Sequence, residues 1–424
     1  MFRLLAIAFR NLLRAKRRNA LSGGTMALGA AALVLGSGLS DGIARQLTRN
    51  LVTVQTGHLQ VVVRPDDFQP QNSPFDAYGL DHLPKAGALA QRIERGGKAA
   101  GVVKAVPFLH ARGTAIAGSR SSLAQIVGVD PAREPELREA LPVAAGAFLP
   151  VGDDLAVYAA APVARKLRLA VGDTVSFVVQ TPQGAVNSLD GIVCGVFQKS
   201  APWYDNAFYV SLRAAQSLLD WPDGATNVKI TLAKGTRAAA RRARPAVEVI
   251  VADSTLSLPA GTRVRVETFD EAGRFSFAII QANEAALVIL SAFLFAAAAA
   301  GVVNGMLMSV HERTREIGTI RALGLRRSTV VRLFLLEGFS LGLVSALLGV
   351  AGGGTLVAYY AATGIPMNTI TLAWIAGGDF LYPALLPGSV AQAVFAIAAL
   401  STLAAVYPAF TASRLEPREA LHHV

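Results

Sequence analysis

Four long apolar runs constrain this 424-residue chain more than any other feature of its sequence. Asn19–Ser40 contains no charged residue, and it is long enough to cross a hydrocarbon core of about 30 Å as a helix. We assign three further spans to residues 284–309, 329–363 and 382–411. The chain is 52% hydrophobic, and its mean hydropathy is +0.42. The sequence therefore predicts an α-helical membrane protein with four transmembrane helices.

Basic residues gather beside these spans. Of the 40 Lys and Arg residues, six lie in residues 1–18 and six lie in residues 313–332. The connection 364–381 contains no Lys or Arg. Because Lys and Arg are enriched on the cytoplasmic side of membrane proteins, both termini and the segment 313–332 are predicted to be cytoplasmic. The net charge of +11 is thus explained by membrane topology, and no nucleic-acid partner is expected.

Residues 1–18 have apolar side chains at helical spacing among basic ones, a pattern typical of a helix on the membrane surface. A basic segment before an apolar run is also the pattern of a signal peptide. The run Asn19–Ser40 is long for that role, and it has no convincing cleavage site. We therefore expect an uncleaved membrane anchor.

Residues 41–283 have the pattern of a large α+β domain outside the cytoplasm. Two apolar stripes bracket it as the helical legs of a stalk, one through Ile43, Leu47, Leu51 and Val54 and one over Phe269–Gln281. Between them we predict strands at Leu59–Val63, Val175–Val179, Ile192–Phe197, Val228–Leu232 and Val264–Val266, and helices at Leu212–Leu219 and Arg237–Val247. Thr181–Asn187 is predicted to be a hairpin loop. The single cysteine, Cys194, excludes an internal disulfide and is expected to be a buried strand residue.

The motifs of common catalytic and metal sites are absent from the sequence. The glycine run 352–354 lacks the Gly-Lys-Ser/Thr ending of a phosphate-binding loop. No Cys, His and carboxylate set has metal-ligand spacing, and no motif marks a catalytic triad. We therefore expect no catalytic residue, no metal and no cofactor on this chain. Energy for any transport would have to come from a partner.

A short charged segment, Ser309–Gly338, separates the second and third spans. His311–Leu323 has the composition of a helix, with apolar Ile317, Ile320 and Leu323 expected on one side. Gly324 is expected to end this helix, and Ser328 is expected to cap the next one. A solvated, positively charged cytoplasmic loop is the simplest interpretation of such a segment.

The order of residues in this segment resembles a known signature. Glu312-Arg313-x-Arg315-Glu316-Ile317-Gly318-x-x-Arg321-Ala322-Leu323-Gly324, followed by residues 334–337 (Phe-Leu-Leu-Glu), resembles the FtsX-like permeases, the MacB/Lol branch of the ABC transporters. One departure is Gly338, where relatives usually carry Ala. In that family the segment is a coupling helix that docks on the ATPase subunit. The resemblance implies ATPase-coupling roles for Glu312, Arg313, Arg315, Glu316, Ile317, Gly318, Arg321, Ala322, Leu323 and Gly324.

The resemblance also implies a domain organisation. The external region would be a MacB-like periplasmic core in two halves, about residues 55–130 and 226–268, with a β-rich insertion at about 131–225. The remaining parts are a cytoplasmic amphipathic helix (1–18), spans at 19–40, 284–309, 329–363 and 382–411, the coupling helix and loop (310–328), an external loop (364–381) and a cytoplasmic tail (412–424). Tyr407–Leu421 resembles the closing motif of the family.

The resemblance finally implies a function. The chain would be a permease subunit in a bacterial inner membrane, with its large domain in the periplasm. It would couple ATP hydrolysis on a separate ATPase dimer, which holds ATP and Mg²⁺, to the release of lipoprotein or lipid-linked cargo outside the membrane. A second permease chain, identical or paralogous, is expected, and a periplasmic carrier or adaptor is a further candidate partner. Three alternatives remain: MacB-type export of drugs or peptides, FtsX-type regulation of a cell-wall hydrolase, and a plain anchored binding domain.

Overall fold

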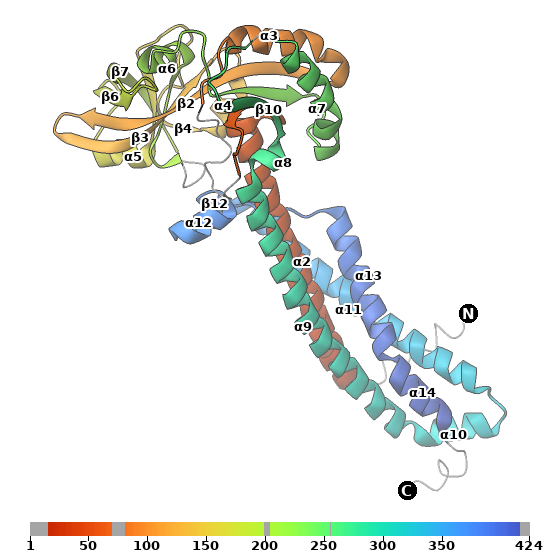
Figure 1. The fold of residues 1–424 in the computed structure, drawn as a ribbon. Coiled ribbons are helices and arrows are strands. Elements are labelled where there is room, and N and C mark those ends of the chain that lie inside the picture. Colours follow the sequence, from red (N-terminus) through yellow and green to blue (C-terminus); the bar gives the residue numbers. More distant parts are fainter. Residues whose placement is uncertain (1–15, 70–80, 199–203, 255, 416–424) are drawn as a thin grey trace. The chain divides into compact units, whose positions relative to one another are not determined.

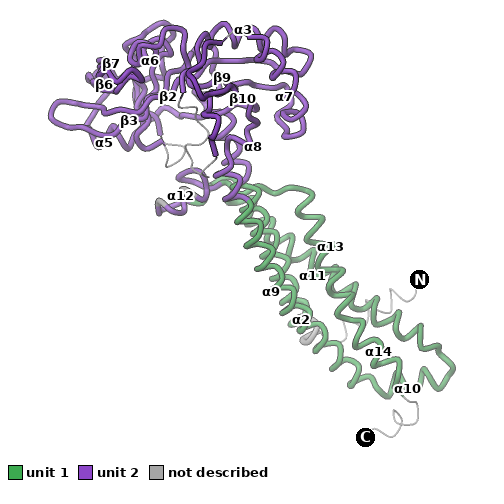
Figure 2. The backbone as a smooth tube through the Cα atoms, in the orientation of Figure 1, with its two compact units in different colours: residues 1–43, 281–365, 382–424 green, residues 44–280, 366–381 purple. Residues whose placement is uncertain are grey.

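The computed structural model describes residues 16–69, 81–198, 204–254 and 256–415 (Figure 1). Within them, four helices are long and apolar enough to cross a membrane. The chain divides into two compact units (Figure 2). Unit 1 comprises residues 1–43, 281–365 and 382–424, and unit 2 comprises residues 44–280 and 366–381. The predicted fold class, four transmembrane helices with a large α+β domain, is confirmed. The expected surface helix at 1–18 and the end of the tail lie almost wholly outside the described residues.

Unit 1 is a bundle of long helices. Its elements are α2 (Lys16–Asn50), α9 (Arg274–Glu312), α10 (Thr314–Ala322), α11 (Arg327–Thr363), α13 (Pro387–Ala404) and α14 (Val406–Arg414), of which α2 and α9 also contribute residues to unit 2. The last predicted span differs from the structure, because its helix begins at Pro387 and not at Tyr382. Leu386 is extended, as a residue before proline prefers to be, and proline favours the first helical position. Ala405 then separates α13 from α14.

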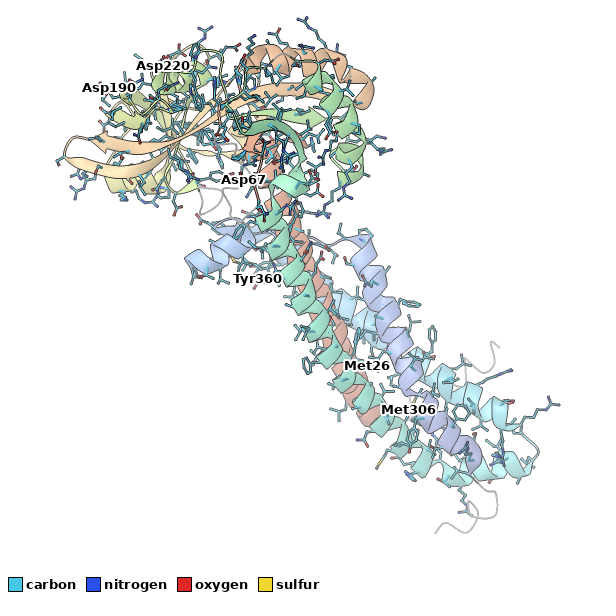
Figure 3. All side chains as sticks on the ribbon, in the orientation of Figure 1. Met26, Asp67, Asp190, Asp220, Met306 and Tyr360 are labelled. Carbon is cyan, nitrogen blue, oxygen red and sulfur yellow. The ribbon has the colours of Figure 1, made fainter. Side chains whose placement is uncertain are left out.

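The helices of unit 1 meet in several apolar clusters, and one of them joins four helices. Met26 of α2 and Met306 of α9 are buried in it with Leu341 and Ala346 of α11 and Ile397 of α13 (Figure 3). Many apolar side chains on the outer faces remain exposed, including Phe293 at 71%. Exposed apolar helix surfaces of this kind are suited to lipid or to another membrane chain.

Glycine allows the closest helix contacts in this bundle. A Cβ on Gly349 of α11 would lie 2.2 Å from the carbonyl oxygen of Ala27 in α2, and one on Gly342 would lie 2.5 Å from Cβ of Ser401 in α13. A Cβ on Gly305 of α9 would lie 2.7 Å from Oγ of Ser22 in α2. At these positions a glycine lets two helices of unit 1 approach more closely than any larger residue would allow.

Unit 2 is built on one continuous sheet of ten strands. Its order is β10-β1-β9-β2-β3-β8-β5-β7-β4, and β6 pairs with β2 and β7. The strands are β1 (Leu59–Pro65), β2 (Val102–Ala117), β3 (Arg120–Val129), β4 (Val143–Gly146), β5 (Ala156–Ala160), β6 (Thr174–Gln180), β7 (Val186–Phe197), β8 (Ala207–Ser211), β9 (Asn227–Leu232) and β10 (Thr262–Thr268). β3–β8 and β5–β7 are parallel pairs, and the other pairs are antiparallel.

The long strand β2 joins the two parts of this sheet. Its first part, Val102–Phe108, pairs with β9, and its second part, Leu109–Ala117, pairs with β3. β3 in turn pairs with β8, which lies in the predicted insertion. The expected division at about residue 130 therefore does not coincide with a break in the sheet.

Helices and two short strands complete unit 2. The helical elements are α3 (Ala86–Gly96), η2 (Lys98–Ala100), α4 (Pro135–Ala140), α5 (Ala161–Leu167), α6 (Leu212–Leu219), α7 (Arg237–Ala252), α8 (Phe269–Ala272) and α12 (Ile370–Ala376). β11 (Ile365–Pro366) begins at the end of unit 1 and pairs with β12 (Phe380–Leu381). The connection 364–381, predicted as a loop, is therefore largely structured.

Both segments predicted as stalk legs are helical, and each differs in detail from the prediction. Ile43, Leu47, Leu51 and Val54 are all buried, but α2 ends at Asn50 and a π-helix, η1 (Leu51–Thr56), follows. The second leg is interrupted at Gly273, which separates α8 from α9. Five strands, β2, β3, β4, β5 and β8, were not predicted from the sequence. Cys194 was expected to be buried, but it is half-buried on β7.

Candidate functional site

The signature segment lies in unit 1 as a short helix between two bends. α9 ends at Glu312, α10 occupies Thr314–Ala322, and α11 begins at Arg327. The predicted helix at 311–323 is therefore shorter than expected, because the non-helical Arg313 (φ −107°, ψ 15°) separates α9 from α10. Gly324 has φ +97°, a conformation that favours glycine, which explains why the chain turns there. The cap of α11 is the extended Arg326 and not Ser328, which lies inside the helix.

One side of α10 packs into unit 1. Ile317 is 8% exposed and clusters with Val310, with Val330 and Phe334 of α11, and with Ala409 and Ala412 of α14. Thr314 and Gly318 are also buried. These residues hold α10 against the bundle, so a movement of α10 would be passed to α11 and α14 by direct packing.

Two arginines of the signature make contacts within the chain. An Nη1 atom of Arg313 lies 3.6 Å from Oε1 of Glu337 on α11, and their side chains are only 16% and 7% exposed. Arg321 donates a hydrogen bond to the carbonyl oxygen of Leu415. Both arginines therefore tie α10 to neighbouring elements of unit 1. Glu337, the last residue of the Phe-Leu-Leu-Glu match, acquires a structural explanation as the partner of Arg313.

The other side of α10 carries the exposed part of the signature. Glu312, Arg315, Glu316, Ala322, Leu323 and Gly324 are all exposed. Leu323 is 83% exposed, and Ile320 and Leu325 beside it are 47% and 38% exposed. The prediction that Ile317, Ile320 and Leu323 share one side is wrong, because Ile317 faces the bundle and the other two face outward. Ile320 and Leu325 were not among the site residues predicted from the sequence.

The exposed surface, formed by Glu312, Arg315, Glu316, Ile320, Leu323 and Leu325, is called the α10 surface. It combines charges of both signs with three exposed apolar side chains. This composition is suited to a protein contact, in which an apolar centre is surrounded by polar groups. In the described part of the chain no group of three or more His, Cys, Asp and Glu residues could hold a metal ion.

Comparison with known families identifies the class of protein. Residues 20–245 match the MacB-like periplasmic core domain, and residues 288–417 match the FtsX-like permease C-terminal domain. The first match alone covers more than half of the chain, so the chain belongs to the MacB-like family. The two matches together define an ABC-transporter permease of the MacB and LolC type. The resemblance identified from the sequence is confirmed.

Individual relatives are similar over parts of their length. The macrolide export ATP-binding/permease protein MacB of Rhodopirellula baltica is 29% identical over 174 residues, which are 39% of this chain and 22% of that protein. The lipoprotein-releasing system transmembrane protein LolC of Neisseria meningitidis serogroup B is 27% identical over 168 residues, which are 38% of this chain and 40% of that protein. The chain thus spans less than half the length of these relatives.

A solved structure is also similar. The periplasmic region of MacB from Actinobacillus actinomycetemcomitans aligns with 52% of this chain and 92% of its own, at 12% identity and a TM-score of 0.34. At that similarity the alignment adds nothing to the family assignment, which rests on the family matches.

Proposed function

We propose that this chain is the permease subunit of a mechanotransmission ABC transporter in a bacterial inner membrane. The α10 surface would dock on a separate ATPase subunit, which holds ATP and Mg²⁺. Closure of two ATPase subunits would then move α10, and the contacts of Ile317 and Arg313 would carry that movement into the membrane helices. The large domain would work in the periplasm, and both termini would lie in the cytoplasm.

The observation that carries this proposal is the two-sided construction of α10. Its inner side is held to α11 and α14 by packing and by the Arg313–Glu337 pair. Its outer side presents Leu323, which is 83% exposed at the end of a charged helix. Ile320 (47%) and Leu325 (38%) lie beside it, so exposed apolar side chains are grouped at this surface, as they are at protein contacts.

The proposed assembly contains two permease chains and two ATPase chains. A pair of ATPase subunits offers two docking sites, and each permease chain has one α10. The exposed apolar faces of the membrane helices are available to a second copy, to a paralogue and to lipid. A periplasmic carrier or adaptor would be an additional partner.

For the substrate, we propose lipoprotein or lipid-linked cargo released from the membrane. The relative named as a lipoprotein-releasing protein, LolC, supports this choice. Export of a drug or peptide is the second candidate, supported by the relatives named as macrolide exporters. A direct assay distinguishes the two candidate substrates. Vesicles that contain the reconstituted transporter and a fluorescent lipoprotein would release the lipoprotein on addition of ATP only if lipoprotein is the substrate.

The docking role is tested by replacing Leu323 with Ala and Glu316 with Ala in the full-length permease co-expressed with its ATPase. We expect normal permease levels in the membrane and at least a tenfold loss of bound ATPase, because both side chains are exposed and lie on the α10 surface. Leu155→Ala is the matched control, since Leu155 is also exposed (53%) but lies in unit 2.

Ile317→Ala serves as a contrast. This side chain is buried inside unit 1, so its loss should lower permease stability by about 2–5 kcal/mol without directly removing a docking contact. Unchanged ATPase recruitment and turnover in the Leu323→Ala and Glu316→Ala variants would contradict the coupling assignment.

A further inference from the structure

Strand β10 forms an open edge of the ten-stranded sheet. It pairs with β1 on one side, and no other described strand pairs with it. Asp66 donates its N–H to the carbonyl of Gly261 (2.9 Å), and Phe269 donates its N–H to the carbonyl of His58 (3.2 Å). In an antiparallel pair, every second residue of a strand directs its N–H and C=O groups toward the neighbouring strand. The two hydrogen bonds show which residues of β10 do so toward β1. The odd-numbered residues of β10 therefore direct their backbone groups toward β1.

The even-numbered residues Val264 and Val266 consequently direct their N–H and C=O groups away from β1. Within the described part of the chain these groups have no hydrogen-bond partner. A row of such groups is a template for another extended chain. The edge of β10 can therefore accept a strand.

A groove runs along this edge. It has a volume of about 600 Å³ and lies between β10 and α7. Val251 of α7, Val264 and Val266 of β10, and Leu256 and Leu258 of the connection between them contribute apolar side chains to its lining. Val251 and Val266 are only 8% and 3% exposed, so the apolar surface beside the strand edge comes mainly from Val264, Leu256 and Leu258.

The charged lining of the groove is mainly positive. Arg263 and Arg265 come from β10 and Arg244 comes from α7, against one carboxylate, Glu248. Arg244 is already paired with Glu248 (2.7 Å) and with Glu271 (2.8 Å), and Nε of Arg263 lies 3.7 Å from Oδ1 of Asp66, with both of those side chains exposed. The side chain of Arg265 makes no ion pair or hydrogen bond with any other described residue, and it also lines a smaller adjoining pocket with Arg64 and Arg274. The guanidinium group of Arg265 is therefore available to a ligand beside the edge of β10.

Side chains alternate between the two faces along a strand, so Val264 and Val266 lie on one face and Arg263 and Arg265 on the other. A strand added beside β10 would alternate in the same way. The side chains of the added strand on one face of the sheet would contact Val264 and Val266. Its side chains on the other face would contact Arg263 and Arg265. Charged residues on an edge strand discourage indiscriminate pairing. These arginines would thus select a strand with carboxylates at matching positions.

We propose that the edge of β10 is a binding site for an extended peptide segment in which apolar and acidic residues alternate. The peptide adds to the sheet through the outward backbone groups of Val264 and Val266, with its apolar side chains in the groove and its carboxylates on Arg263 and Arg265. This mode of recognition obtains affinity from the main chain and specificity from alternate side chains. The site does not depend on the proposed transport function, and it would be present whichever cargo the permease handles.

The test measures binding of a fluorescein-labelled ten-residue peptide of alternating Val and Glu to the full-length permease in detergent. We expect saturable binding, and at least tenfold weaker binding of the same peptide with Lys in place of Glu. Val264→Pro should weaken binding at least tenfold. It removes an outward N–H without removing a bond of the β1–β10 ladder, and proline is tolerated on edge strands.

A charge reversal provides the second variant. Arg265→Glu should weaken binding of the Val/Glu peptide and strengthen binding of the Val/Lys peptide. Arg95→Glu is the matched control, because Arg95 is exposed on α3 and does not line the groove. Equal binding of both peptides, or an unchanged affinity in Val264→Pro, would overturn the proposal. If Val264→Pro does not fold, the proposal is judged by the affinities of Arg265→Glu for the two peptides. If the permease binds no peptide but associates with itself, and Val264→Pro abolishes that association, the proposal is wrong. The edge of β10 would then pair with the same edge of a second copy of the chain.

Discussion

Nζ of Lys229 lies 2.5 Å from Oε2 of Glu134 in the interior of unit 2, where the two side chains are 2% and 0% exposed. The same ammonium donates to the carbonyl oxygen of Thr53 in η1, and Nζ of Lys104 lies 3.1 Å from Oε1 of Glu134. Burial lowers the pKa of Lys229 below its ordinary value, while the carboxylate of Glu134 acts in the opposite direction. This ion pair joins β9, the start of α4 and the π-helix that follows α2.

Breaking this pair should destabilise unit 2. Glu134→Gln leaves the ammonium of Lys229 buried without its main counter-charge, and we expect a loss of about 3–5 kcal/mol. Replacing both residues, Glu134→Leu with Lys229→Met, should restore much of the stability, because no unpaired charge remains. Thermal unfolding of the purified permease measures both effects. Glu139→Gln, an exposed change on α4, the helix that Glu134 directly precedes, is the control. A melting temperature of Glu134→Gln equal to that of the control would refute the assignment.

Two glycines of α11 should respond in opposite ways to alanine. A Cβ on Gly349 would lie 2.2 Å from the carbonyl oxygen of Ala27, so Gly349→Ala must displace α2 and should cost about 1–3 kcal/mol. A Cβ on Gly352, three residues further along, would have nothing within 4 Å. Gly352→Ala should be neutral or stabilising by up to about 1 kcal/mol, because alanine favours helix. Comparable melting temperatures for the two variants in detergent would contradict the close packing of α11 on α2.

The stability of unit 2 should fall in acid because of His110. Burial, with smaller contributions from Arg112 and Lys229, lowers the pKa of His110 to about 3, from an ordinary value of 6.5. Below pH 6.5 the unfolded chain therefore binds a proton that the folded chain does not. The free energy of unfolding should decrease by up to about 1.4 kcal/mol for each pH unit between 6.5 and 3, and this contribution should be constant above 6.5.

The variant that checks this is His110→Gln. Its melting temperature should depend less on pH between 6.5 and 4.5 than that of the unchanged protein. His311→Gln, at an exposed position in unit 1, is the control and should keep the original dependence. An identical pH dependence in all three proteins would show that His110 takes up its proton while folded.

The topology can be tested by cysteine labelling. We predict that a cysteine at Leu323 is reached only from the cytoplasm and that one at Arg95 is reached only from outside, as the charge distribution indicates. Both positions are exposed. Burial raises the pKa of Cys194 to about 11, so its thiol should react slowly, and Cys194→Ser removes it altogether. Labelling of position 323 by an impermeant reagent in intact spheroplasts would show that the orientation in the membrane is the opposite of the predicted one.

The membrane spans and the signature segment could be predicted from sequence because their signals are local. A charge-free run such as Asn19–Ser40 identifies itself by length and composition. Gly324 at a turn and the helix at Leu212–Leu219 likewise follow from a few neighbouring residues. The strands at β1 and β9 were found because their apolar runs are short and bounded by turn residues.

Tertiary structure decided which distant residues meet. β2 joins two parts of a sheet because its halves pair with β9 and β3, and strand pairing across such distances leaves no local signal. The same applies to Arg313 with Glu337 and to Lys229 with Glu134, whose burial no periodicity predicts. α10 is too short for its pattern to define a face, so only packing against α11 and α14 turned Ile317 inward and left Leu323 exposed.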